Sequence, residues 1–445
     1  MKQKKTTVEL LPQKNKTNKD KLYFFRQTFY LCILVLSTSF TACQKKVIDA
    51  SPINPATPFP GISNKVILDW NVNAFETMGG FTYQNTLTAS RLNAMVHIAM
   101  HDALNSIVPV YAKYNNVSGD NDAHPVAAAA TAAHTVLVNH FPEQKAILDE
   151  RLTATLDTIG NISAREKGIA LGTKAGTAIL ELRKNDGAFQ NPVSPLPPST
   201  NMPGIYQTVP PFDFVFAPFW AKMQPFGLQK PDQFRSSPMP TLSSSEYQKD
   251  FNEVKSYGEK NSVLRNTEQT FYAKFWYEFS EIGWNRIARV AAEKEKTDLF
   301  TTARLFALLD IALADSYTAG WDSKFHYNFW RPYTAIHFNN DINWETLMPT
   351  PPVQDYPSTH SILGNAGATV LTAFYGNNYA FGFTSSTSPA PTEVRNFKSF
   401  YQAANENADS RVMAGMHFRF ATKAGLEMGS KIGKWIIENT LKKIK

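Results

Sequence analysis

The chain has 445 residues, of which 43% are apolar and 19% charged, a composition typical of a globular protein with a large core. Its formal net charge is +7, but residues 1–42 alone hold eight basic residues and two acidic ones. The rest of the chain is nearly neutral, which argues against nucleic acid as a partner of the folded part.

Residues 1–42 have the layout of a secretory signal, with a basic start and an apolar run from Phe29 to Phe40 that ends shortly before Cys43. This run is shorter than the roughly 20 residues that span a bilayer. The segment resembles a bacterial lipoprotein signal, which implies an exported protein anchored to a membrane by a lipid on Cys43, in the periplasm or at the outer membrane. Cys32 lies inside the leader, so we expect a mature chain without disulfides.

Residues 43–65 are polar and interrupted by prolines, which predicts a tether. Helical periodicity dominates the chain beyond it, and alternating strand patterns are lacking. We therefore predict one all-α domain over 66–445, with its chemistry in 296–441. The expected helices cover 88–108, 126–141, 143–159, a segment from an N-cap at Ser163 to 185, 245–257, 267–279, 282–293, 296–321, 358–375 and 418–441.

Prolines and aromatic residues crowd the stretch 191–240, which shows no periodicity. We expect a long ordered loop there, serving either as a lid or channel wall or as a covering of the core.

His97 and His101 are spaced like the two histidines of a zinc-protease helix, but Ile98 stands where the glutamate of that pattern belongs. Packing of both rings at a helix interface is therefore the simpler interpretation.

Three short clusters near the C-terminus carry the residues of chemical interest. The first holds Lys324 and Arg331, and we expect the lysine near the end of a long helix and the arginine on the loop after it, because Pro332 disfavours helical angles at Arg331. In the third cluster Gly415 permits a turn that brings Arg411 and His417 to one centre.

The second cluster, Pro357 to His360, predicts a helix start with Ser358 as its cap. The free N–H groups and the positive dipole of such a start attract an anion, and His360 would lie in the first turn beside it. Fixed cations, a hydroxyl and two imidazoles together make a pocket for a tetrahedral oxyanion. No cluster of carboxylates is close by in the sequence, which argues against a divalent metal.

The spacings Lys-x6-Arg-Pro, Pro-Ser-x-His and Ser-Arg-x3-Gly-x-His resemble those of the vanadium-dependent haloperoxidases and of the type 2 phosphatidic acid phosphatases, which share their site. Trp321 and the tract 95–105 are more similar to the haloperoxidase branch. The resemblance extends from about residue 66 onward and implies a helical bundle of the vanadium chloroperoxidase and acid phosphatase type.

The resemblance also implies a role for each motif residue, with vanadate bound through a ring nitrogen of His417. The oxygens of vanadate would be neutralised by Lys324, Arg331 and Arg411 and would accept hydrogen bonds from Ser358 and the N–H of Thr359. His360 would be the acid and base, and Lys324 would polarise bound peroxide.

Hydrogen peroxide and a halide would then be the substrates and hypohalous acid the product. Trp321 and Val353 would line the halide pocket. Secreted bacterial members of this family resemble iodoperoxidases or bromoperoxidases more than chloroperoxidases, which favours iodide or bromide as the halide substrate. The sequence does not decide whether an organic molecule accepts the halogen or whether the chain forms a homo-oligomer.

The same cradle would suit phosphoryl transfer, with His417 as nucleophile and His360 as acid. A secreted acid phosphatase with a phospho-histidine intermediate is therefore the alternative, and a lipoprotein that binds an oxyanion without turnover is a second one.

Two positions depart from the family pattern. Thr359 stands where glycine is usual, and its side chain would crowd the anion. Ala421 stands where many members have aspartate, so the sequence does not identify the group that orients the His417 ring.

Overall fold

The computed structural model describes residues 58–80, 85–195 and 202–444. The expected signal segment, Cys43 and most of the expected tether lie outside these ranges. None of the described helices is long and apolar enough to cross a membrane.

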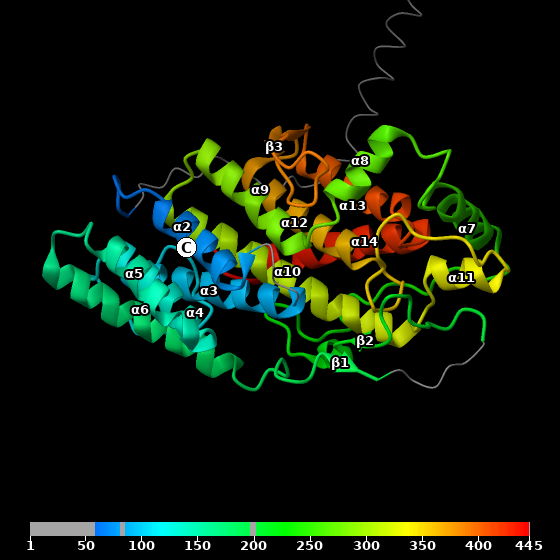
Figure 1. Cartoon of the computed structure of the whole chain (residues 1–445). Helices are drawn as coiled ribbons and strands as arrows, with labels where there is room; N and C mark the ends of the chain where they lie inside the picture. The colour runs from blue at the N-terminus through cyan, green and yellow to red at the C-terminus, as the bar shows by residue number, and fades with distance from the viewer. Residues whose placement is uncertain (1–57, 81–84, 196–201, 445) are drawn as a thin grey trace, which may run out of the picture. The chain divides into compact units, whose positions relative to one another are not determined.

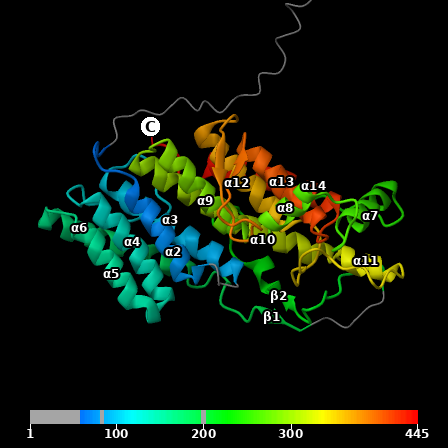
Figure 2. The same cartoon turned by 45° about the horizontal axis from the view of Figure 1, so that its top comes forward.

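The described part of the chain is built almost entirely from α-helices (Figures 1 and 2). In chain order they are α2 (Lys65–Thr77), α3 (Thr86–Ile107), α4 (Pro125–His140), α5 (Lys145–Leu156), α6 (Ile162–Arg183), α7 (Ser245–Tyr257), α8 (Thr267–Phe275), α9 (Ser280–Lys294), α10 (Leu299–Tyr327), α11 (Pro332–Phe338), α12 (Thr359–Tyr375), α13 (Phe400–Met413) and α14 (Arg419–Asn439). The expected all-α class is confirmed.

Two very small antiparallel sheets accompany these helices. Strand β1 (Val193–Ser194) pairs with β2 (Val215–Phe216), and β3 (Phe381–Phe383) pairs with β4 (Arg395–Phe397). Short 3-10 helices cover Pro142–Gln144 and Pro218–Lys222.

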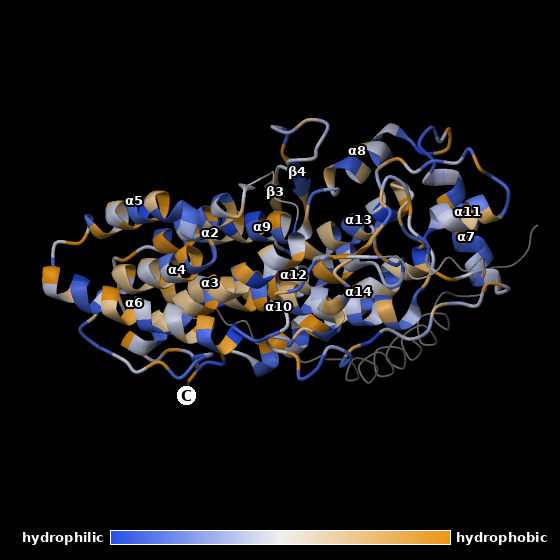
Figure 3. Cartoon of the chain, turned by 60° about the horizontal axis from the view of Figure 1, so that its bottom comes forward, coloured by the Kyte–Doolittle hydropathy of each residue, from blue (hydrophilic) through white to orange (hydrophobic). Residues whose placement is uncertain are grey.

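Helix α10 lies at the centre, packed against α3 on one side and α12 on the other. It begins where the Asp298 side chain accepts the N–H groups of Phe300 and Thr301, and it ends at Asn328 in the left-handed conformation. Its residues are buried around most of its circumference, as expected of a core helix. Figure 3 shows hydrophobic residues concentrated on α3, α4 and α10. This helix therefore connects the N-terminal helices with α12 and α14.

Helices α12 and α14 approach each other closely because α14 carries glycine at every fourth position of the contact. A Cβ atom on Gly425 would lie 2.5 Å from the Ser358 carbonyl oxygen, and one on Gly429 would overlap the Ile362 carbonyl oxygen. The backbone of α14 thus supports the first turn of α12.

All ten predicted helices are present, with some shifted ends. Helix α6 begins at Ile162, capped by the Asn161 side chain and not by Ser163, because Asn161 accepts the Ala164 N–H. The long helix continues past Trp321 to Tyr327. Helices α2, α11 and α13 and both sheets were not predicted.

The described part of 191–240 lies along α10. The Asp315 carboxylate of α10 accepts the N–H groups of Phe226, Gly227 and Leu228 at 2.6 to 2.8 Å. The side chain of Trp220 in the same stretch is buried. These contacts fit the covering of the core that was one of the two expectations.

His97 and His101 both serve helix packing. Nδ1 of His97 lies 2.7 Å from Asp310 Oδ2 on α10, and Nε2 of His101 lies 3.1 Å from the Ala112 carbonyl oxygen. In the part of the chain that the structure describes, no group of three His, Cys, Asp or Glu residues could hold a metal ion.

The variant Gly429→Ala should lose about 1–3 kcal/mol of unfolding free energy, because its Cβ has no room against Ile362. The matched control is Gly160→Ala, where a Cβ would meet no atom within 4 Å and the change should stay below about 0.5 kcal/mol. Urea denaturation measures both. Equal losses would contradict the close approach of α12 and α14.

Candidate active site

Three cationic side chains that are each 1% exposed come from three different elements. Lys324 lies in the last turn of α10, Arg331 is the N-cap residue of α11 with Pro332 in the first turn, and Arg411 lies in the last turn of α13. The predicted placement of Lys324 at a helix end and of Arg331 on the loop after it is confirmed.

Two of these cations hold the loop before α12. Arg331 Nε donates to the Val353 carbonyl at 2.8 Å, and Lys324 Nζ donates to the carbonyls of Gln354 and Asp355 at 2.6 and 3.0 Å. Their hydrogen-bond partners are thus mostly carbonyl dipoles, which leave the net positive charge in place.

His417 is held between a carboxylate and a guanidinium. Its Nδ1 lies 2.8 Å from Asp355 Oδ1, and its Nε2 lies 3.0 Å from Arg331 Nη1. Because arginine only donates and lies closer to Nε2 than to Nδ1, Nε2 is the acceptor. The hydrogen of the neutral ring is then on Nδ1, which lies near Asp355 without a hydrogen bond of good geometry to it. This tautomer directs the Nε2 lone pair into the cation cluster.

Asp355 was not predicted, and it supplies the contact that the sequence left unidentified. Ala421 has a different place, since its backbone carbonyl accepts the Ser358 N–H at 3.0 Å. Two features of the sequence could have identified Asp355. It is a carboxylate just before the predicted anion-binding helix, and a ligating histidine usually places its other nitrogen against a carboxylate or carbonyl.

The turn before His417 depends on Gly415, as predicted. Gly415 has a φ of +80°, and a Cβ there would lie 2.5 Å from the Gly258 carbonyl oxygen. Because this conformation is accessible to glycine and the space is too small for a side chain, the residue allows the chain to reverse after α13.

Ser358 is the N-cap residue of α12, as predicted, but its hydroxyl makes no cap hydrogen bond. Within the described residues, Ser358 Oγ, Thr359 Oγ1 and Arg411 Nε are all buried without a hydrogen-bond partner. A buried polar atom without a partner destabilises the fold unless a ligand or a water molecule forms a hydrogen bond with it. The Thr359 side chain faces Gly320 on α10, where a Cβ would lie 3.6 Å from it, so Gly320 provides the room that threonine needs.

His360 lies in the first turn of α12, as predicted. Its Nε2 lies 3.2 Å from the Glu278 carbonyl oxygen, and the carbonyl of nearby Trp276 accepts from Arg411 Nη1 at 3.4 Å. The loop after α8 therefore contacts both His360 and Arg411.

Burial dominates the electrostatics of the cluster. It raises the pKa of Asp355 to about 7 against the opposing effect of Arg331 and Lys324, and it lowers the pKa of Arg411 to about 10. Burial and the neighbouring Arg331 hold the pKa of Lys324 well below its ordinary value. Burial and the nearby cations also lower the pKa values of His417 and His360, so both rings are neutral near pH 7.

Trp321 and Pro352, the residue before Val353, both hydrogen-bond to Phe216 of strand β2. The Trp321 indole N–H donates to the Phe216 carbonyl at 3.2 Å, and the Phe216 N–H donates to the Pro352 carbonyl at 2.9 Å. The side chains of Trp321 and Val353 are both buried.

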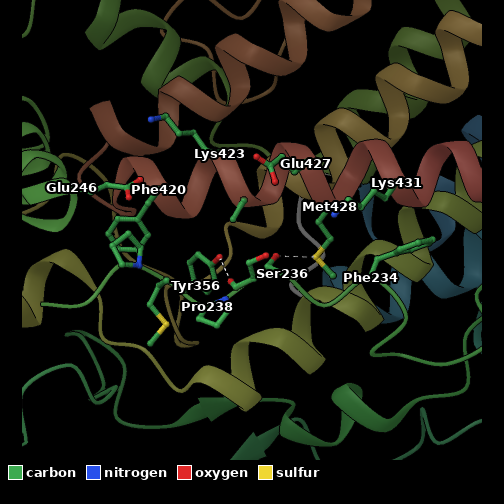
Figure 4. Close-up of a pocket in the computed structure, with 14 residues that line it drawn as sticks. Phe234, Ser236, Pro238, Glu246, Tyr356, Phe420, Lys423, Glu427, Met428 and Lys431 are labelled. Atoms are coloured by element: carbon green, nitrogen blue, oxygen red, sulfur yellow. Dashed lines mark hydrogen bonds between the residues drawn. The ribbon is translucent and has the colours of Figure 1, made fainter. Parts of the chain in front are cut away.

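A groove of about 290 Å³ opens between the loop 234–240 and α14 (Figure 4). Tyr356 lines it and donates its hydroxyl hydrogen to the Ser237 carbonyl at 2.6 Å. None of the motif residues of the cation cluster is among the described residues that line the groove. It is therefore separate from the site.

The cation cluster fits a multiply charged oxyanion. It offers a surplus of buried positive charge, an imidazole nitrogen that accepts from Arg331, a hydroxyl without a partner and the N-terminus of α12.

Comparisons with known proteins agree with this class of site. Residues 304–445 match the family described as the VCPO second helical-bundle domain. The vanadium chloroperoxidase of Curvularia inaequalis is 24% identical over 491 aligned residues, which cover 81% of this chain and 80% of the relative.

Solved structures extend the likeness to the fold. A bacterial vanadium-dependent iodoperoxidase superposes with a TM-score of 0.76 at 25% identity, covering 88% of this chain and 99% of its own. A holo-type bacterial vanadium-dependent chloroperoxidase gives 0.64 at 17% identity, covering 81% and 93%. The fold and the site thus define a helical oxyanion-binding protein of the haloperoxidase type. The chain is thus similar to the vanadium haloperoxidases over most of its length, and its C-terminal third matches the model of their second helical-bundle domain.

The variant Asp355→Asn should bind vanadate about 10–100-fold more weakly, because the His417 ring loses its carboxylate partner and becomes a poorer ligand. Its affinity for sulfate should not fall, because no cation is removed. Equilibrium dialysis measures both. The matched control is Asp322→Asn, which instead loses a contact to Arg235. Unchanged vanadate affinity in Asp355→Asn would contradict the role of Asp355.

Proposed function

We propose that this protein holds vanadate at His417 and oxidises a halide, iodide or bromide, with hydrogen peroxide to hypohalous acid. The observation that carries the proposal is the buried surplus of positive charge around the Nε2 atom of His417. The match of residues 304–445 to the VCPO second helical-bundle domain and the unpartnered Ser358 hydroxyl support it.

Several residues of this chain would hold the anion. His417 would be the ligand through Nε2, with Asp355 fixing the ring through Nδ1. Lys324, Arg331 and Arg411 would neutralise the oxygens, while the hydroxyl of Ser358 and the free N–H groups at the start of α12 would donate to them. Bound vanadate would supply Lewis acidity that activates peroxide towards a halide.

His360 would move the proton. Because burial and Arg411 lower its pKa, the ring is neutral at neutral pH and can accept a proton from incoming peroxide. The protonated ring is then disfavoured among three cations, so it readily returns the proton to the leaving oxygen. Lys324, fixed by two carbonyls, would place positive charge beside the bound peroxide.

The preference for iodide or bromide rests on Trp321 and Val353. The Trp321 N–H is engaged by the Phe216 carbonyl, so this residue can offer a halide its ring but no hydrogen bond. An aromatic ring and an aliphatic side chain suit a large, weakly hydrated halide better than chloride. The TM-score of 0.76 with an iodoperoxidase supports the same choice.

The deciding experiment loads purified residues 44–445 with orthovanadate and measures oxidation of iodide and of bromide by peroxide. We expect halide oxidation that requires vanadate, with chloride the poorest substrate. The same protein without vanadate is tested on an aryl phosphate. Phosphate release without halide oxidation would identify the phosphatase alternative and sink the proposal.

The variants His417→Ala and His360→Ala should separate binding from proton transfer. Loss of the ligand in His417→Ala should abolish vanadate retention, whereas His360→Ala should retain vanadate and lose roughly 10²–10⁴-fold in rate. Vanadate content after gel filtration and initial rates report the two effects. The exposed His326 provides the control His326→Ala, which should change neither. Equal vanadate loss in both site variants would contradict the assigned roles.

A further inference from the structure

The residue before His417 is a methionine that contacts two of the three cations. The Met416 carbonyl accepts from Arg331 Nη1 at 2.9 Å, and its sulfur lies 2.8 Å from Arg411 Nη2. The side chain is 0% exposed. The turn at Gly415 thus places a thioether, together with His417, inside the candidate active site.

The sulfur is close to the place where the oxidant would form. Arg411 has two weak partners, the Met416 sulfur and the Trp276 carbonyl at 3.4 Å, while its Nε has no partner among the described residues. The guanidinium that would bind the oxyanion therefore also contacts the thioether. An oxidant formed beside Arg411 would therefore be close to this sulfur.

We propose that Met416 is oxidised to the sulfoxide by hypohalous acid made in the same site, and that this modification limits the number of turnovers. The inference rests on the proposed function, which supplies the oxidant. The thioether and hypohalous acid give the sulfoxide, a halide ion and a proton. The sulfur loses two electrons and gains the oxygen atom, and the halogen gains the two electrons.

The consequence of this modification follows from the contacts of Met416. A sulfoxide oxygen is a much stronger hydrogen-bond acceptor than a thioether, and it also needs additional space. Next to Arg411 it would engage the guanidinium in place of the oxyanion, and the added oxygen would press on the buried neighbours of Met416. Oxidation at Met416 should therefore weaken vanadate binding as well as slow the reaction.

Two other methionines serve as internal references. Met202 is 60% exposed, so oxidant that has escaped into solution should reach it first. Met413 is buried three residues before Met416, and its carbonyl accepts from Arg265 and not from a cation of the site.

The test uses the vanadate-loaded full chain with peroxide and whichever halide it oxidises. Peptide mass spectrometry follows the sulfoxide at Met416, Met413 and Met202 as the rate declines, with and without free methionine as a scavenger in solution. We expect Met416 oxidation to track the loss of rate and to persist with scavenger, while Met202 is protected. Hypohalite added from outside should reverse the order, and peroxide without halide should leave Met416 intact.

The variants Met416→Leu and Met413→Leu complete the test, since leucine has nearly the volume of methionine. Relative to its own initial rate, Met416→Leu should sustain several-fold more turnovers before half of that rate is lost, whereas Met413→Leu should decline like the wild type. Absence of halide oxidation would refute the proposed function itself. Halide oxidation with unmodified Met416, or Met416 oxidation suppressed by the scavenger, would overturn this inference even if Met416→Leu failed to fold.

Discussion

The structure depends on the burial of Lys324, Arg331 and Arg411 around one imidazole. Moving each such cation out of water costs several kcal/mol, and among the described residues Asp355 is the carboxylate that approaches Arg331. The remaining compensation comes from the carbonyls of residues 353–355, 276 and 416. The loop carbonyls therefore stabilise the buried cations, and the same hydrogen bonds hold the loops in place. An anion would complete a cradle that the protein already holds in place.

The surrounding helices pack closely around this cradle. Lys324 and Gly320 lie one turn apart on α10, and α14 presses its glycines against the start of α12. These contacts set the position of Ser358 relative to Lys324. Because oxyanion stabilisation needs donors fixed before the reaction, helix packing far from the chemistry contributes to the site.

The parts of this site that could be predicted were those encoded by local rules. Proline after Arg331, proline before Ser358 and glycine before His417 each determine a backbone conformation, and each expectation is confirmed. Asp355 meets its partner His417 across 62 residues of sequence, and Thr359 finds its space at Gly320 on another helix, so neither contact follows from spacing alone.

The elements that were missed also have a physical explanation. Helix α13 buries three alanines together with the polar Asn407, Ser410 and Arg411, so its buried face gives little periodic hydrophobic contrast with its polar face. Helix α11 has seven residues, too few for a periodic pattern. The lipoprotein leader and its anchor at Cys43 lie outside the described residues and stay predictions.

The burial of the three cations bears on whether the site holds an anion permanently, as with vanadate, or releases it at every turnover, as with phosphate. A phosphatase must release phosphate at every turnover, so strong binding of the product by three buried cations would slow it. A prosthetic oxyanion gains from the same strong binding, because it is never released. The Asp355 contact adds to this, since it keeps Nε2 of His417 directed at the anion and makes the ring a better permanent ligand. The charge balance and the ring orientation of this site therefore suit retention of vanadate better than the rapid exchange of phosphate.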